Sequence, residues 1–344
     1  MKLILLFILI LINQGTDIMA QSQSDFSTIS IDRPIWCLGL EDASWLLPNI
    51  KRDKKVALFA FNNVFDSTAK EGTKKENDIG RITRAIPLYI AERLTLETNL
   101  NANLLVVCKN GIGPVLAGKR TAGKELATSL STQNLDYIVT GIIEENKNQT
   151  IISIYLYETK SNKEELITQI KRNNTDISEV GAESVNDFFK NASIFQNYKA
   201  IETNNYNYSR PSAEMTSYYL KGIGQLLMQM LVVNNIISKD QLWGEDEMLN
   251  WYQTLLRNEP NNHCCKLLYF NGIVSSISYK GSAYKNHVEG FIKNNDFKDN
   301  SDPIVRLFPI LYNKLNDRIN LTKSIEKLSK AKSEDYKRWL NQFK

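Results

Sequence analysis

The first 20 residues divide into a basic start, an apolar centre and a polar end. Lys2 precedes an unbroken apolar run from Leu3 to Ile12, and the polar stretch after it ends in the small residue Ala20, before Gln21. This is the layout of a secretory signal peptide, and the run is about half as long as a membrane-spanning helix requires. We expect cleavage between Ala20 and Gln21, no transmembrane span after cleavage, and a periplasmic or secreted mature protein.

After a polar leader over residues 21–53, strand patterns and helix patterns alternate as far as residue 193. Short apolar or alternating runs of the kind that form strands lie at 55–61, 104–108, 137–143, 151–157 and 165–170. Apolar residues recur at the intervals of three and four that mark an amphipathic helix over 79–94, 122–130 and 177–188. The order predicts an α+β domain over 54–193, with a β-α-β-α-β-β-β-α sequence of elements in a sandwich-like arrangement.

Three local signals refine these elements. Pro87 falls inside the first helical pattern, where proline lacks a hydrogen-bond donor, so we expect a kink or a helix start there. Residues 146–148 have the composition of a tight hairpin turn. Asp176, with Glu179 three residues further on, has the form of a capping box that begins the last helix of the domain.

The second half of the chain has only helical periodicity. Residues 194–211 are polar and rich in tyrosine, follow neither a strand nor a helix period, and are interpreted as a linker. From 212 to 344 apolar positions recur at helical spacing, and an amphipathic closing helix is expected over 321–344. This pattern predicts a C-terminal, all-α domain of the helical-repeat type.

Several motifs of the first domain occur in the order that one family shows. They are Val56–Asn62, then Ala117-Gly-Lys119, then Leu126-Ala127, then Leu135-Asp-Tyr-Ile-Val-Thr-Gly141, and after the hairpin Tyr155-Leu-Tyr-Glu-Thr159. Over about residues 54 to 190 the chain resembles the TolB amino-terminal-like domain, which is shared with FlgO-type flagellar envelope proteins. The resemblance implies a docking or assembly module without a known catalytic group.

Proteins of this type commonly continue into tetratricopeptide repeats, and the helical half resembles such a continuation. Tyr219-Leu-Lys-Gly222 resembles the first helix of a repeat, and Leu255–Asn262 resembles the proline-bearing junction between two repeats. A second, less regular junction falls near Asn294–Asp296. Because a helix pair cannot bury its apolar face alone, the resemblance implies a short, degenerate array of stacked units that share one core.

Charge and cysteine content narrow the function classes. The chain has 42 basic and 38 acidic side chains, and the net charge of +4 is too small to indicate nucleic acid or an acidic substrate as a partner. Four cysteines are too few and too scattered for a disulfide framework. Cys37 and Cys108 can pair in an oxidising compartment, although Cys108 ends an apolar run that favours a buried free thiol. Both states stay open.

Residues 113–120 come within one residue of a phosphate-binding P-loop. Arg120 stands where that motif needs the hydroxyl of Ser or Thr, and Pro114 removes a backbone donor from the loop that would hold the phosphates. We expect a structural loop, and keep a nucleotide or small-ligand site over Gly111–Thr121 as the alternative.

No other pattern indicates catalysis or a metal. The chain has two histidines, and His263 adjoins Cys264 and Cys265. Consecutive side chains on a helix diverge by about 100°, so these three are expected to belong to a helix and its core, not to a zinc site. The acidic runs 144–145 and 245–247 are assigned to a turn and to a helix start. We expect no catalytic residue, no cofactor and no metal ligand, and a protein that is not an enzyme.

Aromatic residues of the helical half give the candidate binding surface. They are Tyr218, Tyr219, Trp243, Trp251 and Tyr252. Such residues either fill the core between helices or form a peptide-binding face. With the export signal, they predict a scaffold or assembly factor that binds another, unidentified envelope protein, and self-association stays open. A component of a motility or secretion machine at the cell surface is the alternative.

Overall fold

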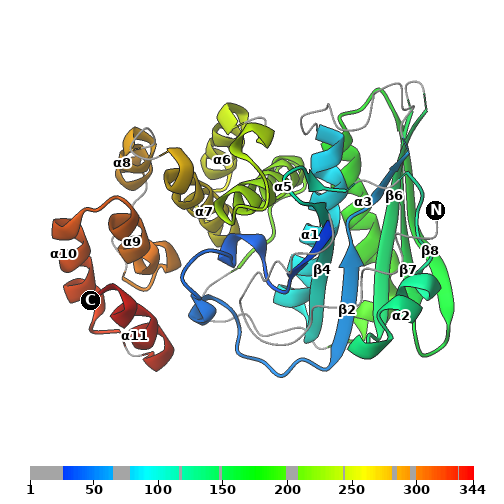
Figure 1. Cartoon of the computed structure of the whole chain (residues 1–344), viewed down its shortest axis with the longest axis horizontal. Coiled ribbons are helices and arrows are strands. Elements are labelled where there is room, and N and C mark those ends of the chain that lie inside the picture. The colour runs from blue at the N-terminus through cyan, green and yellow to red at the C-terminus, as the bar shows by residue number, and fades with distance from the viewer. Residues whose placement is uncertain are drawn as a thin grey trace.

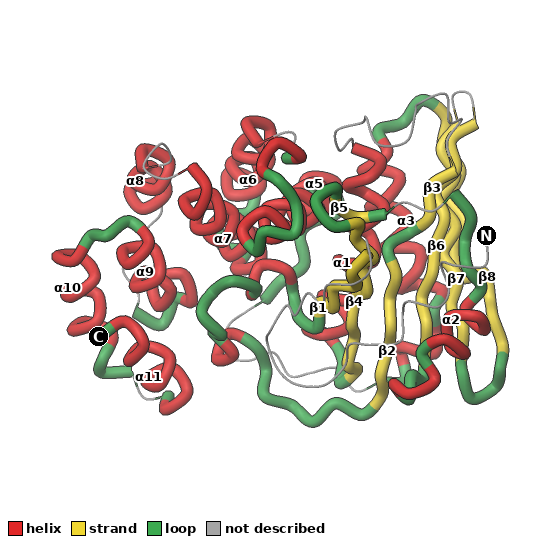
Figure 2. The backbone as a smooth tube through the Cα atoms, viewed as in Figure 1, coloured by secondary structure: helices red, strands yellow, loops and turns green. Residues whose placement is uncertain are grey.

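The computed structural model describes residues 26–64, 78–115, 118–146, 149–198, 208–242, 245–280, 285–294, 300–331 and 333–344. Strands gather at one end of the molecule, and helices continue from them to the other end (Figures 1 and 2). The fold class is α+β, as predicted. The predicted signal peptide and its cleavage site at Ala20 and Gln21 lie outside the described residues.

Eight strands form one mixed sheet in the first half of the chain. In chain order they are β1 (Phe26–Ile31), β2 (Lys54–Phe59), β3 (Asn62–Val64), β4 (Leu100–Lys109), β5 (Gly113–Pro114), β6 (Tyr137–Asn146), β7 (Gln149–Glu158) and β8 (Lys163–Asn173). The order across the sheet is β1-β4-β2-β6-β7-β8, with β3 paired to β6 and β5 paired to β4. β4, β2 and β6 are parallel, while β1, β7 and β8 run antiparallel to their neighbours.

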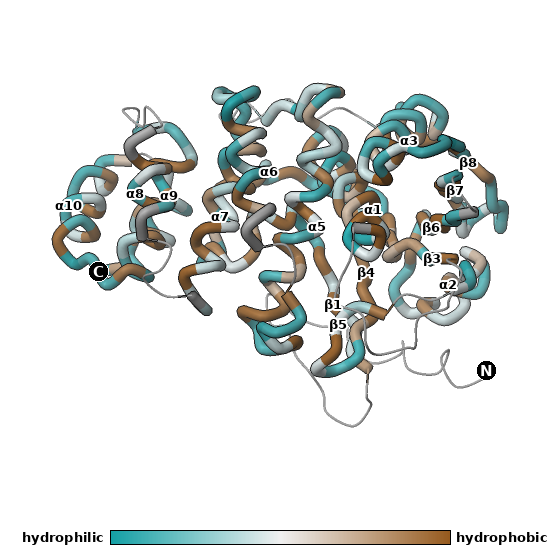
Figure 3. The backbone as a smooth tube through the Cα atoms, turned by 90° about the horizontal axis from the view of Figure 1, so that it is seen from above, coloured by the Kyte–Doolittle hydropathy of each residue, from teal (hydrophilic) through white to brown (hydrophobic). Residues whose placement is uncertain are grey.

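Helices cover both faces of this sheet. α1 (Asp78–Glu97) and α3 (Ile177–Asn191) pack on one face, and the shorter α2 (Gly123–Ser129) lies on the other (Figure 3). Because side chains alternate along a strand, β4 directs Leu104 and Val106 into the large core of the molecule, whereas Leu105 packs with Leu126 of α2. This layering is the sandwich-like arrangement that the sequence predicted.

α1 begins at Asp78 and runs on past Pro87, so the helix does not start at the proline. Proline has no N–H to donate to the carbonyl of Thr83, one turn earlier. That carbonyl instead accepts a hydrogen bond from the backbone N–H of Phe61, at 2.8 Å. The bond satisfies the carbonyl that Pro87 frees and ties α1 to the segment after β2.

The predicted hairpin and the start of α3 at Asp176 are confirmed, while the contact from the Glu179 side chain that would complete a capping box is absent among the described residues. Asn146 of β6 pairs with Gln149 of β7, which closes the predicted hairpin. Asp176 caps α3, because its side chain accepts a hydrogen bond from the backbone N–H of Ser178 at 2.8 Å.

The second half of the chain contains only helices among its described elements. They are α5 (Thr216–Val233), α6 (Glu245–Asn258), α7 (His263–Lys280), α8 (Lys285–Asn294), α9 (Pro303–Lys314), α10 (Arg318–Leu328) and α11 (Glu334–Leu340), with 3₁₀ helices η5 (Lys239–Gln241) and η7 (Asn341–Phe343). α5 packs against α1 and α3 on one side and against α6 and α7 on the other. One apolar core therefore runs from the sheet into the C-terminal helices.

The described part of the segment 21–53 belongs to the fold and is not a leader. β1 adds an antiparallel edge strand to β4, with Ile29 and Ile31 buried. The residues after it form 3₁₀ helices η2 (Ile35–Cys37) and η3 (Ser44–Leu46), and a further short 3₁₀ helix, η4 (Ser131–Gln133), follows α2. The sequence did not predict β1, because three of its six residues are Ser or Thr and the stretch has the composition of a polar leader.

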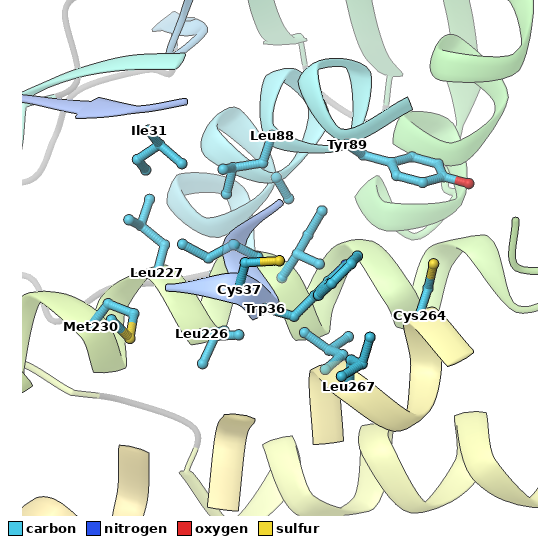
Figure 4. Packing of buried hydrophobic residues seen from close by; sticks show 14 of the residues in the cluster. Ile31, Trp36, Cys37, Leu88, Tyr89, Leu226, Leu227, Met230, Cys264 and Leu267 are labelled. Carbon is cyan, nitrogen blue, oxygen red and sulfur yellow. The ribbon is translucent and has the colours of Figure 1, made fainter. Parts of the chain in front are cut away.

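Residues 32–46, called the strap from here on, cross from the sheet to the C-terminal helices. Asn271 of α7 donates through Nδ2 to the carbonyls of Trp36 and Leu38, at 3.0 and 2.7 Å. Trp339 of α11 donates through Nε1 to the carbonyl of Leu40, at 3.2 Å. Figure 4 shows Trp36 among residues of α1, α5 and α7. The strap thus connects the two predicted domains.

The predicted linker and closing helix also differ from the structure. The linker 194–211 begins inside α4 (Ser193–Gln196), whose Phe195 is buried. The closing segment 321–344 is divided between α10 and α11, because the hydroxyl of Ser333 caps a new helix by accepting the backbone N–H of Tyr336. Across the described residues, no helix is both long enough and apolar enough to cross a membrane.

Candidate functional site

The loop that approaches the P-loop motif is held against the sheet. Gly113 and Pro114 form β5, which pairs antiparallel with the end of β4. Further on, Arg120 donates two hydrogen bonds to the carboxylate of Glu164 in β8, at 2.8 and 3.0 Å. Its guanidinium also lies 3.8 Å from the centre of the Tyr155 ring. Residues 116 and 117 of this loop lie outside the described residues.

Glu164 also lies beside the start of α2. It accepts the backbone N–H of Gly123, the first residue of α2, at 2.7 Å. The hydrogen bonds from Arg120 and from this N–H hold the pKa of Glu164 below its ordinary value. The chain's own carboxylate therefore pairs with Arg120 and accepts the first N–H of α2, which fits the structural-loop interpretation. The nucleotide site stays an alternative.

The structure separates the predicted aromatic residues into different environments. Tyr219 and Tyr252 are fully buried and do not contribute to an exposed face, which corrects the prediction for these two. Trp251 is half-buried, with the guanidinium of Arg81 4.7 Å from its ring centre. Tyr218 is exposed, and Trp243 lies outside the described residues. The described members of this set therefore do not form a common binding surface.

The cysteines and the candidate zinc segment lie in the interior. Cys264 and Cys265 are buried in the first turn of α7, and Cys37 and Cys108 are buried free thiols. Burial raises the pKa of all four thiols, so the reactive thiolate form is disfavoured. Asn262, at the predicted junction between α6 and α7, accepts the backbone N–H of Cys265 at 3.2 Å.

A buried carboxyl that the sequence gave no reason to select lies between α1, α5 and the strap. Glu92 of α1 accepts a hydrogen bond from the hydroxyl of Tyr219, at 2.7 Å. Burial raises its pKa to about 8. A carboxyl surrounded by apolar residues has no local pattern in the sequence, since the residues that bury it come from three distant segments.

β8 is the longer of the two strands that end the sheet order, with 11 residues against six in β1. β8 ends the strand order, and none of the described strands pairs with its outer side. Of its 11 residues only Thr168 is buried. The N–H and C=O groups on such an edge can pair with another strand.

Charge and apolar character change along β8. Glu164 and Glu165 lie near its start, Lys171 and Arg172 lie near its end, and the uncharged run 166–170 lies between them. Leu166 in this run is 48% exposed. A bulge interrupts the pairing with β7, because Leu166 and Thr168 face the consecutive residues Tyr155 and Ile154, which leaves Ile167 without a partner in the ladder.

A small pocket of about 110 Å³ adjoins the first half of β8. Leu156, Ile167 and Ile194 give it an apolar wall, and Lys163 and Glu165 border it as an ion pair. The edge of β8 therefore offers both backbone groups and a recess for one side chain.

No protein-family model and no curated protein matches the sequence. Among solved structures, TolB from Acinetobacter baumannii aligns with 43% of this chain and 29% of its own, at 14% identity and a TM-score of 0.26. A PelC dodecamer from Paraburkholderia phytofirmans aligns with 50% of this chain and 97% of its own, at 12% identity and a TM-score of 0.25. Both are partial likenesses at low scores, so no function follows from either. The tetratricopeptide interpretation stays a prediction.

Proposed function

We propose that this chain is an exported, non-catalytic envelope protein that works as a scaffold, binding another envelope protein through the edge of β8. The observation that carries the proposal is the exposed 11-residue strand at the end of the sheet order. An extended segment of a partner would add a strand there, with backbone hydrogen bonds for affinity and side chains for specificity.

The middle of β8 suits this role better than the helical surface does. The run 166–170 has no charge to repel an incoming strand, and Leu166 presents apolar area on the side of the sheet that carries α2. In contrast, Tyr219 and Tyr252 of the helical half are enclosed in the core. Charges at the two ends of β8 limit pairing with arbitrary strands, as edge charges do in other sheets.

Partner capture with one substitution on the edge tests the binding role. Leu166→Asp places a charge in the uncharged centre, so we expect about tenfold weaker capture of the partner from an envelope fraction, equivalent to roughly 1.4 kcal/mol. Ile319→Asp is the matched control, because Ile319 is an exposed aliphatic residue on α10, far along the chain from the sheet. Equal loss in both variants, or no partner captured by folded wild-type protein, would contradict the proposal.

Export is tested separately. The apolar run 3–12 and the small residue Ala20 favour cleavage, so the protein isolated from cells should begin at Gln21 and appear in the fraction released by osmotic shock or in the medium. Mass spectrometry of the intact protein gives the terminus. A chain that retains Met1 and stays in the cytosol excludes this part of the proposal.

A further inference from the structure

We propose that the edge of β8, when no other partner occupies it, pairs with β8 of a second copy of this chain, antiparallel and around a twofold axis between Ile167 and Thr168. The inference rests on the proposed role of β8 as a contact edge and names one occupant for it. It follows from the bulge, from the faces on which the side chains lie, and from the order of charges along the strand.

The bulge changes which residues of β8 face α2. Before it, Glu164 contacts Arg120 and the start of α2, and Leu166 lies opposite Tyr155, whose ring Arg120 covers. After the bulge, Gln169 lies opposite Ser153 and donates a hydrogen bond to its hydroxyl at 3.1 Å. The residues of β8 that face α2 are therefore even-numbered before the bulge and odd-numbered after it. By the same alternation Lys171 lies on the α2 side.

The other side of β8 faces α3. Arg172 pairs with Glu183 of α3, and Ile167 and Ile170 pack against the core beneath that helix. Thr168 is buried on this side as well, because the bulge places two consecutive residues there. The residue numbers that lie on the α3 side are therefore odd before the bulge and even after it.

In a symmetric pair of β8 strands, only certain registers place residues of the same face opposite each other. Side chains directly opposite each other in an antiparallel pair lie on one face of the sheet, and a twofold axis perpendicular to the sheet preserves the faces. Pairing Ile167 with Thr168 of the second copy puts Leu166 opposite Gln169 and Glu164 opposite Lys171, all on the α2 side. Every residue before the bulge then meets a residue after it.

The charges favour this antiparallel arrangement over a parallel one. A parallel pair in register would set Glu164 and Glu165 of each β8 against the same two residues, whereas the antiparallel pair brings them toward the basic end of the strand. Glu164 then lies opposite Lys171, and Glu165 lies diagonally from Arg172 on the α3 side. Lys163 lies opposite Arg172, and this contact between like charges is offset by the carboxylates that each already binds, Glu165 and Glu183.

Lys171 is the charge on β8 that gains a partner in this pair. Glu164 is bound by Arg120, Glu165 by Lys163, and Arg172 by Glu183. Within the described part of the chain, no ion pair is formed by Lys171. The pair across the axis therefore joins Lys171 to a carboxylate that its own chain cannot offer it.

The strength of the association follows from its size. One pair of strands buries less surface than a typical stable interface, so a weak dimer that forms as concentration rises is expected. Exposed opposite charges contribute to it, so added salt lowers its stability.

Sedimentation velocity on the full mature chain tests the association. We expect a monomer–dimer equilibrium whose dissociation constant rises about tenfold in Lys171→Glu, because two carboxylates then face each other, with a smaller difference from wild type at high salt. Lys323→Glu on α10 makes the same charge change elsewhere and should leave the equilibrium unchanged. A wild-type monomer at every concentration, or equal effects of both substitutions, overturns the proposal.

Cysteine cross-linking tests the register. Leu166→Cys with Gln169→Cys places two thiols opposite each other across the axis, while the native cysteines are buried. On oxidation this variant should give a covalent dimer in non-reducing electrophoresis. In the control, Leu166→Cys with Lys171→Cys, both thiols lie on the α2 side but diagonally across the two strands. This variant should cross-link several-fold less. Equal yields from the two variants contradict the assigned register.

The two proposals fail in different ways. A chain that stays monomeric but loses its envelope partner in Leu166→Asp keeps the scaffold function and excludes the pairing between copies. A chain that dimerises through β8 but captures no envelope protein keeps the pairing and excludes the scaffold function.

Discussion

Glu92 shows how a single side chain makes the fold sensitive to pH. Its pKa is about 8 in the folded protein, where burial disfavours the charged form, against an ordinary value of 4.5. Between these values the folded state holds a proton that the unfolded state releases. Stability is therefore fully present below about pH 4.5 and falls as pH rises toward 8, by up to about 1.4 kcal/mol per pH unit.

Glu92→Gln should remove most of this pH dependence. The amide cannot ionise, and it can still bond to the hydroxyl of Tyr219, so we expect the variant to match or exceed the wild type in stability at pH 8. Urea unfolding at pH 5, 6, 7 and 8 measures the change. Glu326→Gln, at an exposed position of α10, is the control and should leave the slope as it is in the wild type. An equally steep slope in Glu92→Gln would show that another group titrates.

Glu164 is the residue that distinguishes a structural loop from a ligand site. Glu164→Ala leaves the guanidinium of Arg120 and the N–H of Gly123 without their shared acceptor, so we expect about 1–2 kcal/mol lower stability for these partly exposed hydrogen bonds. Thermal unfolding in the presence and absence of millimolar nucleotide is the measurement. The wild type should show the same melting temperature in both conditions. A nucleotide-dependent rise would restore the alternative that the chain binds a small ligand.

At the scale of elements, continuous apolar runs were the most informative part of the sequence. The five predicted strands correspond to β2, β4, β6, β7 and β8, within a few residues of their limits. β3 and β5 contain three and two residues, too few for any periodicity to appear. β1 is longer, but its alternating Ser, Thr and Ile residues have the composition of a polar leader until β4 is present to pair with them.

The candidate sites were harder to predict because they depend on contacts between distant residues. The acceptor for Arg120 lies in β8, 44 residues further along the chain. The hydroxyl that binds Glu92 lies 127 residues away. The position of a strand at the edge of a sheet cannot be predicted from its own residues either, because no pattern within β8 indicates that it is the last strand. Helical spacing located the aromatic residues but did not show which of them face inward.

Pro87 gives a prediction about α1. Proline inside a helix ordinarily costs roughly 3 kcal/mol, partly because a carbonyl loses its donor. Here the carbonyl of Thr83 has the N–H of Phe61 instead, so Pro87→Ala should raise the free energy of unfolding by well under that amount. Chemical denaturation compares the two proteins. A gain near 3 kcal/mol would mean that the bond between Phe61 and Thr83 contributes little.

At the scale of the whole molecule, two predicted domains share one interior. α5 contacts both the helices that cover the sheet, α1 and α3, and the C-terminal helices α6 and α7. The strap crosses the same region. Trp36 is fully buried where these parts meet. The boundary at 194–211 therefore separates patterns in the sequence without separating two hydrophobic cores.

Trp36→Ala tests this unity. Replacing a buried tryptophan with alanine lowers the free energy of unfolding by roughly 3–5 kcal/mol. Because both halves of the chain pack against Trp36, we expect them to lose stability together. Far-ultraviolet circular dichroism and tryptophan fluorescence should report coincident unfolding in the wild type and in the variant. Trp251→Ala, at a half-buried position, is the comparison and should cost less. Two separate transitions, with only one shifted by Trp36→Ala, would argue for independent domains.

The bond from Trp339 to the carbonyl of Leu40 joins residues that are 299 positions apart in the chain. The strap leaves the ribosome well before α11, so these contacts form only once α11 has emerged. Until then Trp45, which in the finished fold lies against Tyr336 and Trp339, has no aromatic neighbours from that helix. We therefore expect the strap to gain its full stability only after synthesis of α11, so a nascent chain that stops short of α11 should be cleaved by protease within residues 32–46.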